Sequence, residues 1–380
     1  MHFDFNAYSS PLLFGFVQAW VYTFLFWRRA ISTRRLSDWL FGALLFAMSF
    51  EIWEYMLGFG GVDILWTTLE FLPRNFSFLL PALFYYYLKS QVNTNFRFQR
   101  KDLRHLVPFL VYLLYHTGVY VQGPQVVEWW KEHVHYVWVD NVEAFVMLFM
   151  QVYYFAKAYK LYQDYRKWAP NEFSDTESIS FRWYRNFLLA YILSNVANWS
   201  MTLADVFLNL DFWHDWWDEL LNAGLIYYLA IAGYGQIQPL KIQFEADTAL
   251  LQPDNPEQIP TKSEKIPENE LESWRALLDQ SMQEQQYYLE AELTLSELAK
   301  RLKTNTNTLS AAINQAYGKN FNDFVNAYRV EAVKKMLNDD SVQHLSLLGI
   351  AYECGFNSKS TFNRAFKKAT GVAPSAYPIP

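Results

Sequence analysis

The first 237 residues alternate between long apolar segments and short polar loops. The seven apolar segments cover residues 11–27, 37–59, 67–88, 105–121, 140–162, 181–203 and 216–237. Each approaches the roughly 20 residues that an α-helix needs to cross a hydrocarbon core of about 30 Å. A soluble core could not bury so many such segments. The pattern therefore predicts a seven-helix transmembrane bundle over residues 1–237.

Basic residues are distributed unevenly among the loops of this bundle. Only Lys131 lies in the N-terminal segment and the loops of one side. Fifteen basic residues follow the first and third segments or flank the loop after the fifth, namely Arg28, Arg29, Arg34, Arg35, Lys89, Arg97, Arg100, Lys101, Arg104, Lys157, Lys160, Arg166, Lys167, Arg182 and Arg185. Cytoplasmic loops carry the excess of Lys and Arg, so the N-terminus is predicted outside and the C-terminus in the cytoplasm.

Several polar residues lie within or near the apolar segments. Charge at bilayer depth is costly and usually faces the bundle interior or a wet cavity. Glu70 and Arg74 stand four residues apart, so pairing on one helix face is favoured for them over ligand binding. Pro73 and Pro81 indicate local kinks in the same helix. The candidates for a sensor pocket are Glu51, Glu54, Glu70, Arg74, Asn195 and Asn198.

Aromatic residues make up 19% of the chain and crowd into its first 240 residues. Near the outer boundary of the bundle they favour an interfacial aromatic belt. A ligand-binding aromatic wall is the alternative. The residues concerned are Trp129, Trp130, Trp138, Trp213, Trp216 and Trp217.

The pattern changes after residue 237. Residues 238–267 contain five prolines and no sustained apolar period, which predicts a flexible linker. A connecting helix is predicted over residues 268–288, with apolar residues at only half of its heptad positions. Packing against the following domain is therefore favoured over a dimer-forming coiled coil. Residues 293–380 carry eleven Lys or Arg against six Asp or Glu, so the predicted domain at 289–380 is basic.

Residues 294–317 have the pattern of a helix-turn-helix unit, which we call the first head. Thr294 and Glu297 have the spacing of a capping box, in which each side chain satisfies a free amide at a helix start. A polar turn follows, and Asn305 is suited to cap a second helix from residue 306 to about residue 317. Two short helices joined by such a turn form this unit.

A long helix and a second head follow. Residues 321–337 carry one apolar stripe, and at 1.5 Å per residue these 17 residues span roughly 25 Å. In the stretch "LLGIAYECGFNSKSTFNRAFKKATGVAPSAY", Ser346 and Ser358 can cap two helices, and Gly355 permits the positive φ of the turn between them. The long helix at residues 321–337 can act as a rigid rod that holds the two heads near one DNA turn apart, about 34 Å.

This stretch resembles the signature of AraC/XylS-type transcription regulators, whose DNA-binding domain has two helix-turn-helix units joined by one long helix. The resemblance covers about residues 290–378 and includes the first head and the long helix. Lys367 and Lys368 are expected at DNA phosphates. Base-facing positions implied by the resemblance are Lys359, Ser360, Thr361, Asn363 and Arg364 in the second head, and Asn307, Ser310 and Ala311 in the first.

Three residues depart from the family pattern. Ala311 stands where a long polar or basic residue is frequent, so the first head is expected to read fewer bases. Gly349 replaces a frequent Glu and weakens its helix by about 1 kcal/mol relative to Ala. Pro378 stands where the motif often ends with Arg.

The whole chain resembles membrane-anchored AraC-type regulators of bacteria, which implies an all-α protein in the bacterial inner membrane. Its implied partners are double-stranded promoter DNA, RNA polymerase and membrane lipid; a homodimer and an unidentified small-molecule or protein signal fit as well. No cofactor is expected. The bundle either senses the signal or serves as a passive anchor or platform for a partner protein.

An enzyme is the third class of protein considered. Glu51, Glu54 or His116 would be its catalytic residues within the bundle, but the sequence has no paired metal ligands, nucleophile elbow or phosphate loop. Cys354, the one cysteine, excludes an intrachain disulfide and any multi-cysteine metal site. We therefore expect that the protein is not an enzyme.

Overall fold

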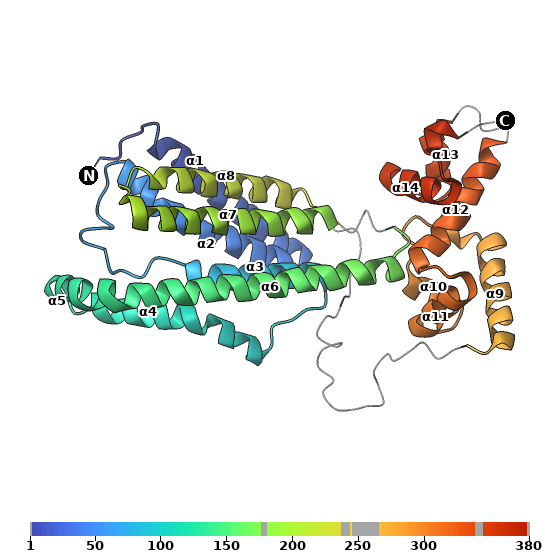
Figure 1. The fold of residues 1–380 in the computed structure, drawn as a ribbon, viewed down its shortest axis with the longest axis horizontal. Helices are drawn as coiled ribbons and strands as arrows, with labels where there is room; N and C mark the ends of the chain where they lie inside the picture. The colour runs from blue at the N-terminus through green and yellow to red at the C-terminus, as the bar shows by residue number, and fades with distance from the viewer. Residues whose placement is uncertain (1, 176–180, 237–243, 245–265, 339–344, 378–380) are drawn as a thin grey trace. The chain divides into compact units, whose positions relative to one another are not determined.

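The computed structural model describes residues 2–175, 181–236, 244, 266–338 and 345–377, and no β-strand occurs among them. The predicted all-α class is confirmed for these residues. Two compact units are present: residues 1–162 with 182–243, and residues 163–181 with 244–380 (Figure 1). This grouping differs from the sequence-based division at residue 237, because residues 163–181 contact the C-terminal part of the chain.

The first unit is built from long helices. They are α1 (Ser9–Thr33), α2 (Leu36–Phe59), α3 (Leu80–Val92), α4 (Val107–Tyr120), α5 (Pro124–Trp130), α6 (Asp140–Glu172), α7 (Phe181–Leu208) and α8 (Asp215–Tyr234). Short 3₁₀ helices η1 (Ser77–Leu79) and η2 (Arg100–Leu106) precede α3 and α4, and a π-helix η3 (Lys131–Val139) joins α5 to α6. The last turns of α6 belong to the second unit.

Close packing joins α1, α2 and α8 in this unit. Gly15 on α1 lies so near Ala223 on α8 that an added Cβ would meet the Ala223 Cβ at 2.9 Å. Arg29 then ties the ends of the three helices together, because its guanidinium donates to both Asp38 oxygens at 2.7 and 2.9 Å and to the Tyr234 carbonyl at 2.8 Å. Small residues and a paired charge allow close contact between helices.

The third apolar segment, residues 67–88, is not one helix. Residues 67–76 form turns and irregular chain, so the predicted pairing of Glu70 and Arg74 on one helix face is wrong. Pro73 lies in this irregular part, and Pro81 lies in the first turn of α3, where a missing N–H costs nothing. The two prolines thus precede and begin a helix and do not kink one. The fourth segment is also shorter than predicted, because α4 has 14 residues.

Three helices have the length and apolar composition needed to cross a membrane: Ser9–Thr33, Leu36–Phe59 and Trp183–Leu208. The first two coincide with the first two predicted segments, and the third coincides with the sixth. The count of seven crossings stays a prediction.

The second unit contains two small helical cores joined by one helix. Its elements are α9 (Glu268–Gln283), η4 (Tyr287–Leu289), α10 (Leu295–Arg301), α11 (Thr306–Tyr317), α12 (Phe321–Leu337), α13 (Leu347–Glu353), α14 (Lys359–Thr370) and η6 (Pro374–Ala376). Four predicted helix caps are confirmed: Thr294 with Glu297 as a capping box, Asn305, Ser346 and Ser358. These caps set where the short helices start.

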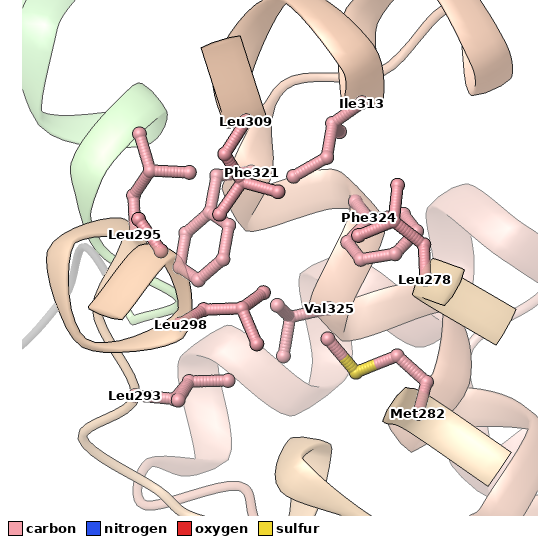
Figure 2. Close-up of a cluster of buried hydrophobic side chains, with 11 residues drawn as sticks. Leu278, Met282, Leu293, Leu295, Leu298, Leu309, Ile313, Phe321, Phe324 and Val325 are labelled. Atoms are coloured by element: carbon pink, nitrogen blue, oxygen red, sulfur yellow. The ribbon is translucent and has the colours of Figure 1, made fainter. Parts of the chain in front are cut away.

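The first core lies between α9, the first head and the N-terminal half of α12. Figure 2 shows its side chains, among them Leu278, Met282, Leu293, Leu295, Leu298, Leu309, Ile313, Phe321, Phe324 and Val325. Leu278 and Met282 of α9 are fully buried in it, so α9 packs against the domain as the favoured interpretation predicts. Burying each such side chain contributes roughly 1.5–3 kcal/mol.

The second core lies between the C-terminal half of α12 and the second head. Its buried members are Val330, Val333, Ile350, Ala351, Cys354, Phe356, Phe362 and Phe366. Burial raises the pKa of the Cys354 thiol to about 11, as expected of a structural cysteine. Helix α12 therefore contributes side chains to both cores, and Figure 1 shows it between the helices of the two heads.

We expect Gly355→Ala to destabilise the second head more than Gly371→Ala. Both glycines have positive φ, +88° and +79°, but only at Gly355 would a Cβ meet backbone, the Tyr288 carbonyl oxygen at 2.4 Å. The free energy of unfolding should fall by about 3 kcal/mol at Gly355 and about 1 kcal/mol at Gly371. Hydrogen exchange over residues 347–377 of the full-length protein measures both, and equal losses would contradict this close approach.

Candidate DNA-binding surface and bundle cavity

Helix α14 presents a polar face to solvent. Ser358 accepts a hydrogen bond from the Thr361 N–H at 3.2 Å and so fixes the first turn. Phe362 and Phe366 are buried on the inner face. The exposed residues are Lys359, Ser360, Asn363, Arg364, Lys367 and Lys368, all of which were predicted to contact DNA. The structure thus brings six of the seven candidates in this helix onto one accessible surface.

Thr361, the seventh candidate, is buried. Only 1% of its surface is exposed, and its hydroxyl donates to Asp175 at 2.7 Å. Its side chain therefore lies on the inner side of α14, away from the exposed polar face. Local sequence could not predict this contact, because Asp175 stands 186 residues earlier in the chain.

The second head also makes an ion pair with α12. The Lys368 ammonium lies 2.7 Å from an Asp323 carboxylate oxygen, while 66% of the Lys368 side chain stays exposed. An exposed pair of this kind contributes little to stability. It does hold the Lys368 ammonium beside α12, so Lys367 is the better candidate for a phosphate contact at this end of the helix.

The candidates in the first head lie on α11. Asn305 caps this helix by accepting from the Thr308 N–H at 2.8 Å. Asn307 is exposed, whereas Ser310 and Ala311 are half-buried. Leu309 is fully buried and anchors the opposite side of the helix. The first head therefore offers a smaller polar surface than the second.

Arg329 is a structural residue that the sequence did not single out. It is fully buried on α12, and its guanidinium donates to the carbonyls of Tyr288 and Glu290, each at 2.7 Å. Burial lowers the pKa of Arg329 to about 10, an effect that the nearby Asp175 carboxylate opposes. The apolar periodicity of α12 gave no signal for a buried cation.

Three of the six sensor candidates line one cavity in the first unit. Glu51, Asn195 and Asn198 face a cavity of about 210 Å³, together with Ser77, Gln151 and Asn222. Ser77 donates to Glu51 at 2.6 Å, and Asn198 donates to Asp218 at 3.1 Å. The other walls are apolar residues of α2, α3, α6, α7 and α8, such as Leu44, Phe84, Met147, Tyr191 and Ile226.

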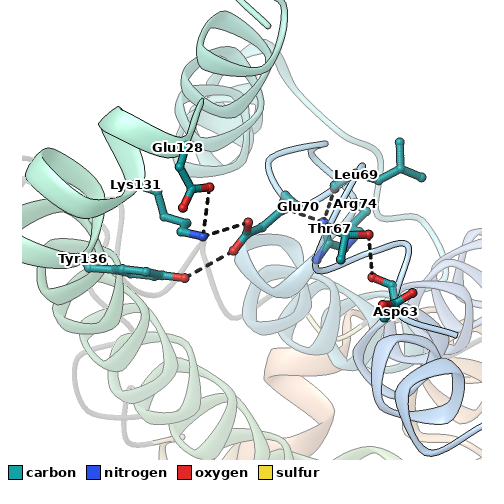
Figure 3. A network of polar contacts seen from close by, with 8 residues as sticks. All are labelled: Asp63, Thr67, Leu69, Glu70, Arg74, Glu128, Lys131 and Tyr136. Carbon is teal, nitrogen blue, oxygen red and sulfur yellow. Dashed lines mark hydrogen bonds and ion pairs between the residues drawn. The ribbon is translucent and has the colours of Figure 1, made fainter. Parts of the chain in front are cut away.

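The other three candidates lie outside this cavity. Arg74 forms an ion pair with Glu54 and donates to the backbone carbonyl of Glu70 at 2.8 Å. The Glu70 carboxylate instead accepts from Lys131 at 3.1 Å and from Tyr136 at 3.4 Å, in the network that Figure 3 shows. These charges cross-link loops and helix starts, so they have a packing role.

Asp218 and Glu219 are not among the predicted pocket residues. Both are buried, with 7% and 6% exposure, and Asp218 Oδ1 and Glu219 Oε2 have no hydrogen-bond partner among the described residues. They were recognisable as ionisable residues in an apolar segment. The contact of Asp218 with Asn198 depends on the packing of α7 against α8.

The geometry of the second unit, two helix-turn-helix heads on one shared helix, defines a DNA-binding domain. Residues 298–378 match the family described as a helix-turn-helix domain. An 88-residue part is 34% identical to an uncharacterized HTH-type transcriptional regulator, YtdP, of Bacillus subtilis. An 85-residue part is 29% identical to the melibiose operon regulatory protein of Escherichia coli. This C-terminal domain belongs to the AraC family.

The similarity is confined to this domain. It covers 23% and 22% of the chain, and 11% and 27% of the two relatives. No solved structure matches the chain. The first unit is therefore interpreted from its own residues.

We expect Arg364→Ala to remove sequence preference and Lys367→Ala to weaken binding at every site alike. Arginine reads base edges through its planar fork, and loss of a bidentate base contact costs about 1–3 kcal/mol. A phosphate contact carries no sequence information. The measurement is genome-wide crosslinking of the intact protein to DNA, with both variants at matched protein level. Enrichment of no discrete promoters by the wild type would contradict this interface.

Proposed function

We propose that the chain is a membrane-bound, sequence-specific transcription regulator that transfers a signal from the membrane or periplasm to promoter DNA. The C-terminal AraC-type domain supports the DNA-binding half of this proposal. The bundle of seven predicted spans is the anchor, with the N-terminus outside and the DNA-binding domain in the cytoplasm. In the expected complex, promoter DNA and RNA polymerase are the cytoplasmic partners, and the domain acts alone or as a homodimer.

The observation that carries membrane insertion is the outward apolar surface of the first unit. Large apolar side chains are exposed on several helices: Phe14 at 64%, Leu114 at 71%, Phe145 at 72% and Phe207 at 75%. They belong to α1, α4, α6 and α7, so apolar surface is not confined to one patch. Water disfavours so large an exposed apolar area, whereas lipid tails accommodate it.

A topology reporter tests this placement. A reporter that works only in the cytoplasm should be active when fused after Pro380, and one that works only in the periplasm should be inactive there. The basic loops are expected in the cytoplasm, and an odd number of spans then places the C-terminus on the same side. A second fusion, at the N-terminus, should report the periplasm. Activity of the C-terminal fusion in the periplasm would exclude DNA binding in the cell.

The cavity in the first unit supports a sensing role. Amide and carboxyl groups of Glu51, Asn195 and Asn222 face it, and no Lys, Arg or His is among the described residues that line it. Its roughly 210 Å³ is smaller than the roughly 300–1,000 Å³ of sites for drug-sized ligands. The cavity therefore suits the polar head of a small amphiphile that donates hydrogen bonds. A ligand shifts an equilibrium only by binding one state more tightly than the other.

Filling the cavity separates sensing from passive anchoring. Asn195→Leu adds apolar volume to the cavity, and the hydrogen bond that it removes runs within one helix, from the Asn195 amide to the Tyr191 carbonyl. We expect promoter occupancy to become insensitive to growth conditions that change it several-fold in the wild type. Val196→Leu, at an exposed neighbouring position, is the matched control. An unchanged response in Asn195→Leu would favour the passive anchor.

A further inference from the structure

Residues 173–175 follow the last turn of α6 and lie buried against the C-terminal domain. Phe173, Ser174 and Asp175 expose 4%, 0% and 4% of their surface. Phe173 forms an isolated antiparallel bridge with Thr294, and the Ser174 N–H donates to the Leu293 carbonyl at 3.2 Å. We call residues 173–175 the docking segment. It thus contacts the chain directly before the first head.

Three polar side chains of α12 converge on the docking segment. Asn322 and Asn326 donate to the Ser174 carbonyl at 2.7 and 3.0 Å. Arg329 donates to the Ser174 hydroxyl at 3.1 Å. These residues stand at i, i+4 and i+7, which is one face of a helix, and all three are buried.

This polar face is costly without a partner. A buried amide or guanidinium that loses its acceptor pays its full desolvation penalty. In the described residues, Asn322 Nδ2 donates only to the carbonyls of Phe173 and Ser174. The surface of α12 is therefore suited to a segment that presents backbone carbonyls, and the chain supplies that segment itself.

The docking segment also reaches the second head. Asp175 accepts the hydrogen bond of the Thr361 hydroxyl at 2.7 Å, in the first turn of α14. Asn363 and Arg364 stay exposed in this arrangement. The segment therefore contacts the inner side of α14, and the exposed face that is proposed to read bases stays accessible. One short segment thereby touches the first head, α12 and α14.

Helix α6 connects this contact to the bundle. It runs from Asp140 to Glu172 with Pro170 in its last turn, and the docking segment follows at once. Met147 and Gln151 of the same helix line the cavity of the first unit. A change at the cavity and the seating of the docking segment therefore involve one helix.

We propose that the docking segment is a built-in ligand of the DNA-binding domain. While the segment is bound, the two heads are held in one arrangement. The segment is released when the bundle shifts α6. This proposal rests on the proposed function and names the route of its signal. The route runs through α6 and does not require the linker at 238–267 to transmit the change. Seated and released states differ in the contacts of Asp175 and Ser174, which gives the differential free energy that a switch needs.

Cysteine crosslinking in native membranes tests the seating. The protein carries Cys354→Ser, a protease site within residues 245–265, and the pair Asp175→Cys with Thr361→Cys. After treatment with copper phenanthroline and protease, the two fragments should stay joined until a reductant is added. Asp164→Cys with Thr361→Cys is the control that should separate, because Asp164 lies on α6, before the docking segment. Separation of both pairs would overturn the docking.

A double-mutant cycle tests whether the seating matters for DNA. Asp175→Ala and Thr361→Val should each lower promoter occupancy about tenfold, because each removes one hydrogen bond to a charged group. The double variant should be no worse than either single variant, since they remove the same contact. Asp175→Asn keeps an acceptor oxygen and should restore most occupancy. Asp164→Ala should match the wild type, and membrane protein levels must be equal.

The outcomes distinguish this proposal from the proposed function on which it rests. If the wild type enriches discrete promoters while both single variants match it, the coupling is wrong and the regulator stands. Additive losses in the double variant would also overturn the coupling, because they indicate separate contacts. If the wild type enriches nothing, the proposed function fails, and the crosslink still decides whether the segment docks.

Discussion

The fold of the second unit depends on one buried cation. Arg329 has no exposed surface, and its guanidinium donates to the carbonyls of Tyr288, Glu290 and Ala291, to Asn326 and to Ser174. A guanidinium can be buried only if such acceptors surround it. Arg329 therefore joins three pieces of chain: α12, the turn before α10, and the docking segment after α6. Removing its acceptors would leave an unpaired charge in the interior.

Helix α12 can hold both heads because different parts of its surface pack against different parts of the domain. Phe321, Phe324 and Val325 enter the first core, whereas Val330 and Val333 enter the second. Asn322, Asn326 and Arg329 form the polar face between them. The two cores are consequently small but share a common axis, so the heads cannot tilt without disturbing apolar packing on one side.

In the first unit, polar residues are sorted by how they are satisfied. Arg74 and Lys131 neutralise Glu54 and Glu70 near the loops. Glu51, by contrast, accepts a hydrogen bond from the Ser77 hydroxyl and faces the cavity. A carboxyl without a cation in an apolar bundle is costly. That difference is why the cavity, and not the loop network, is the better candidate for recognising a ligand.

Local rules in the sequence were enough to predict the second unit closely. Caps at Thr294, Asn305, Ser346 and Ser358 lie next to the residues that they satisfy, so their spacing is readable along the chain. The apolar period likewise gave α12 its bounds. The long apolar segments also predicted α1, α2 and α7, because the hydrophobicity of a segment can be read from its own residues. The failure at residues 67–76 arose because composition there resembles a span while the prolines prevent a continuous helix.

Contacts between distant residues were decided by tertiary structure alone. Asp175 and Thr361, Ser174 and Asn322, and Glu70 and Lys131 are each far apart in sequence. A side chain's own neighbours do not reveal such a partner, so local sequence predicts an exposed Thr361 and an Arg74 paired with Glu70. Local sequence patterns predicted most of the helices and the class of the C-terminal domain. Packing determined which polar groups meet, because a buried hydrogen bond depends on where two helices touch and not on either helix alone.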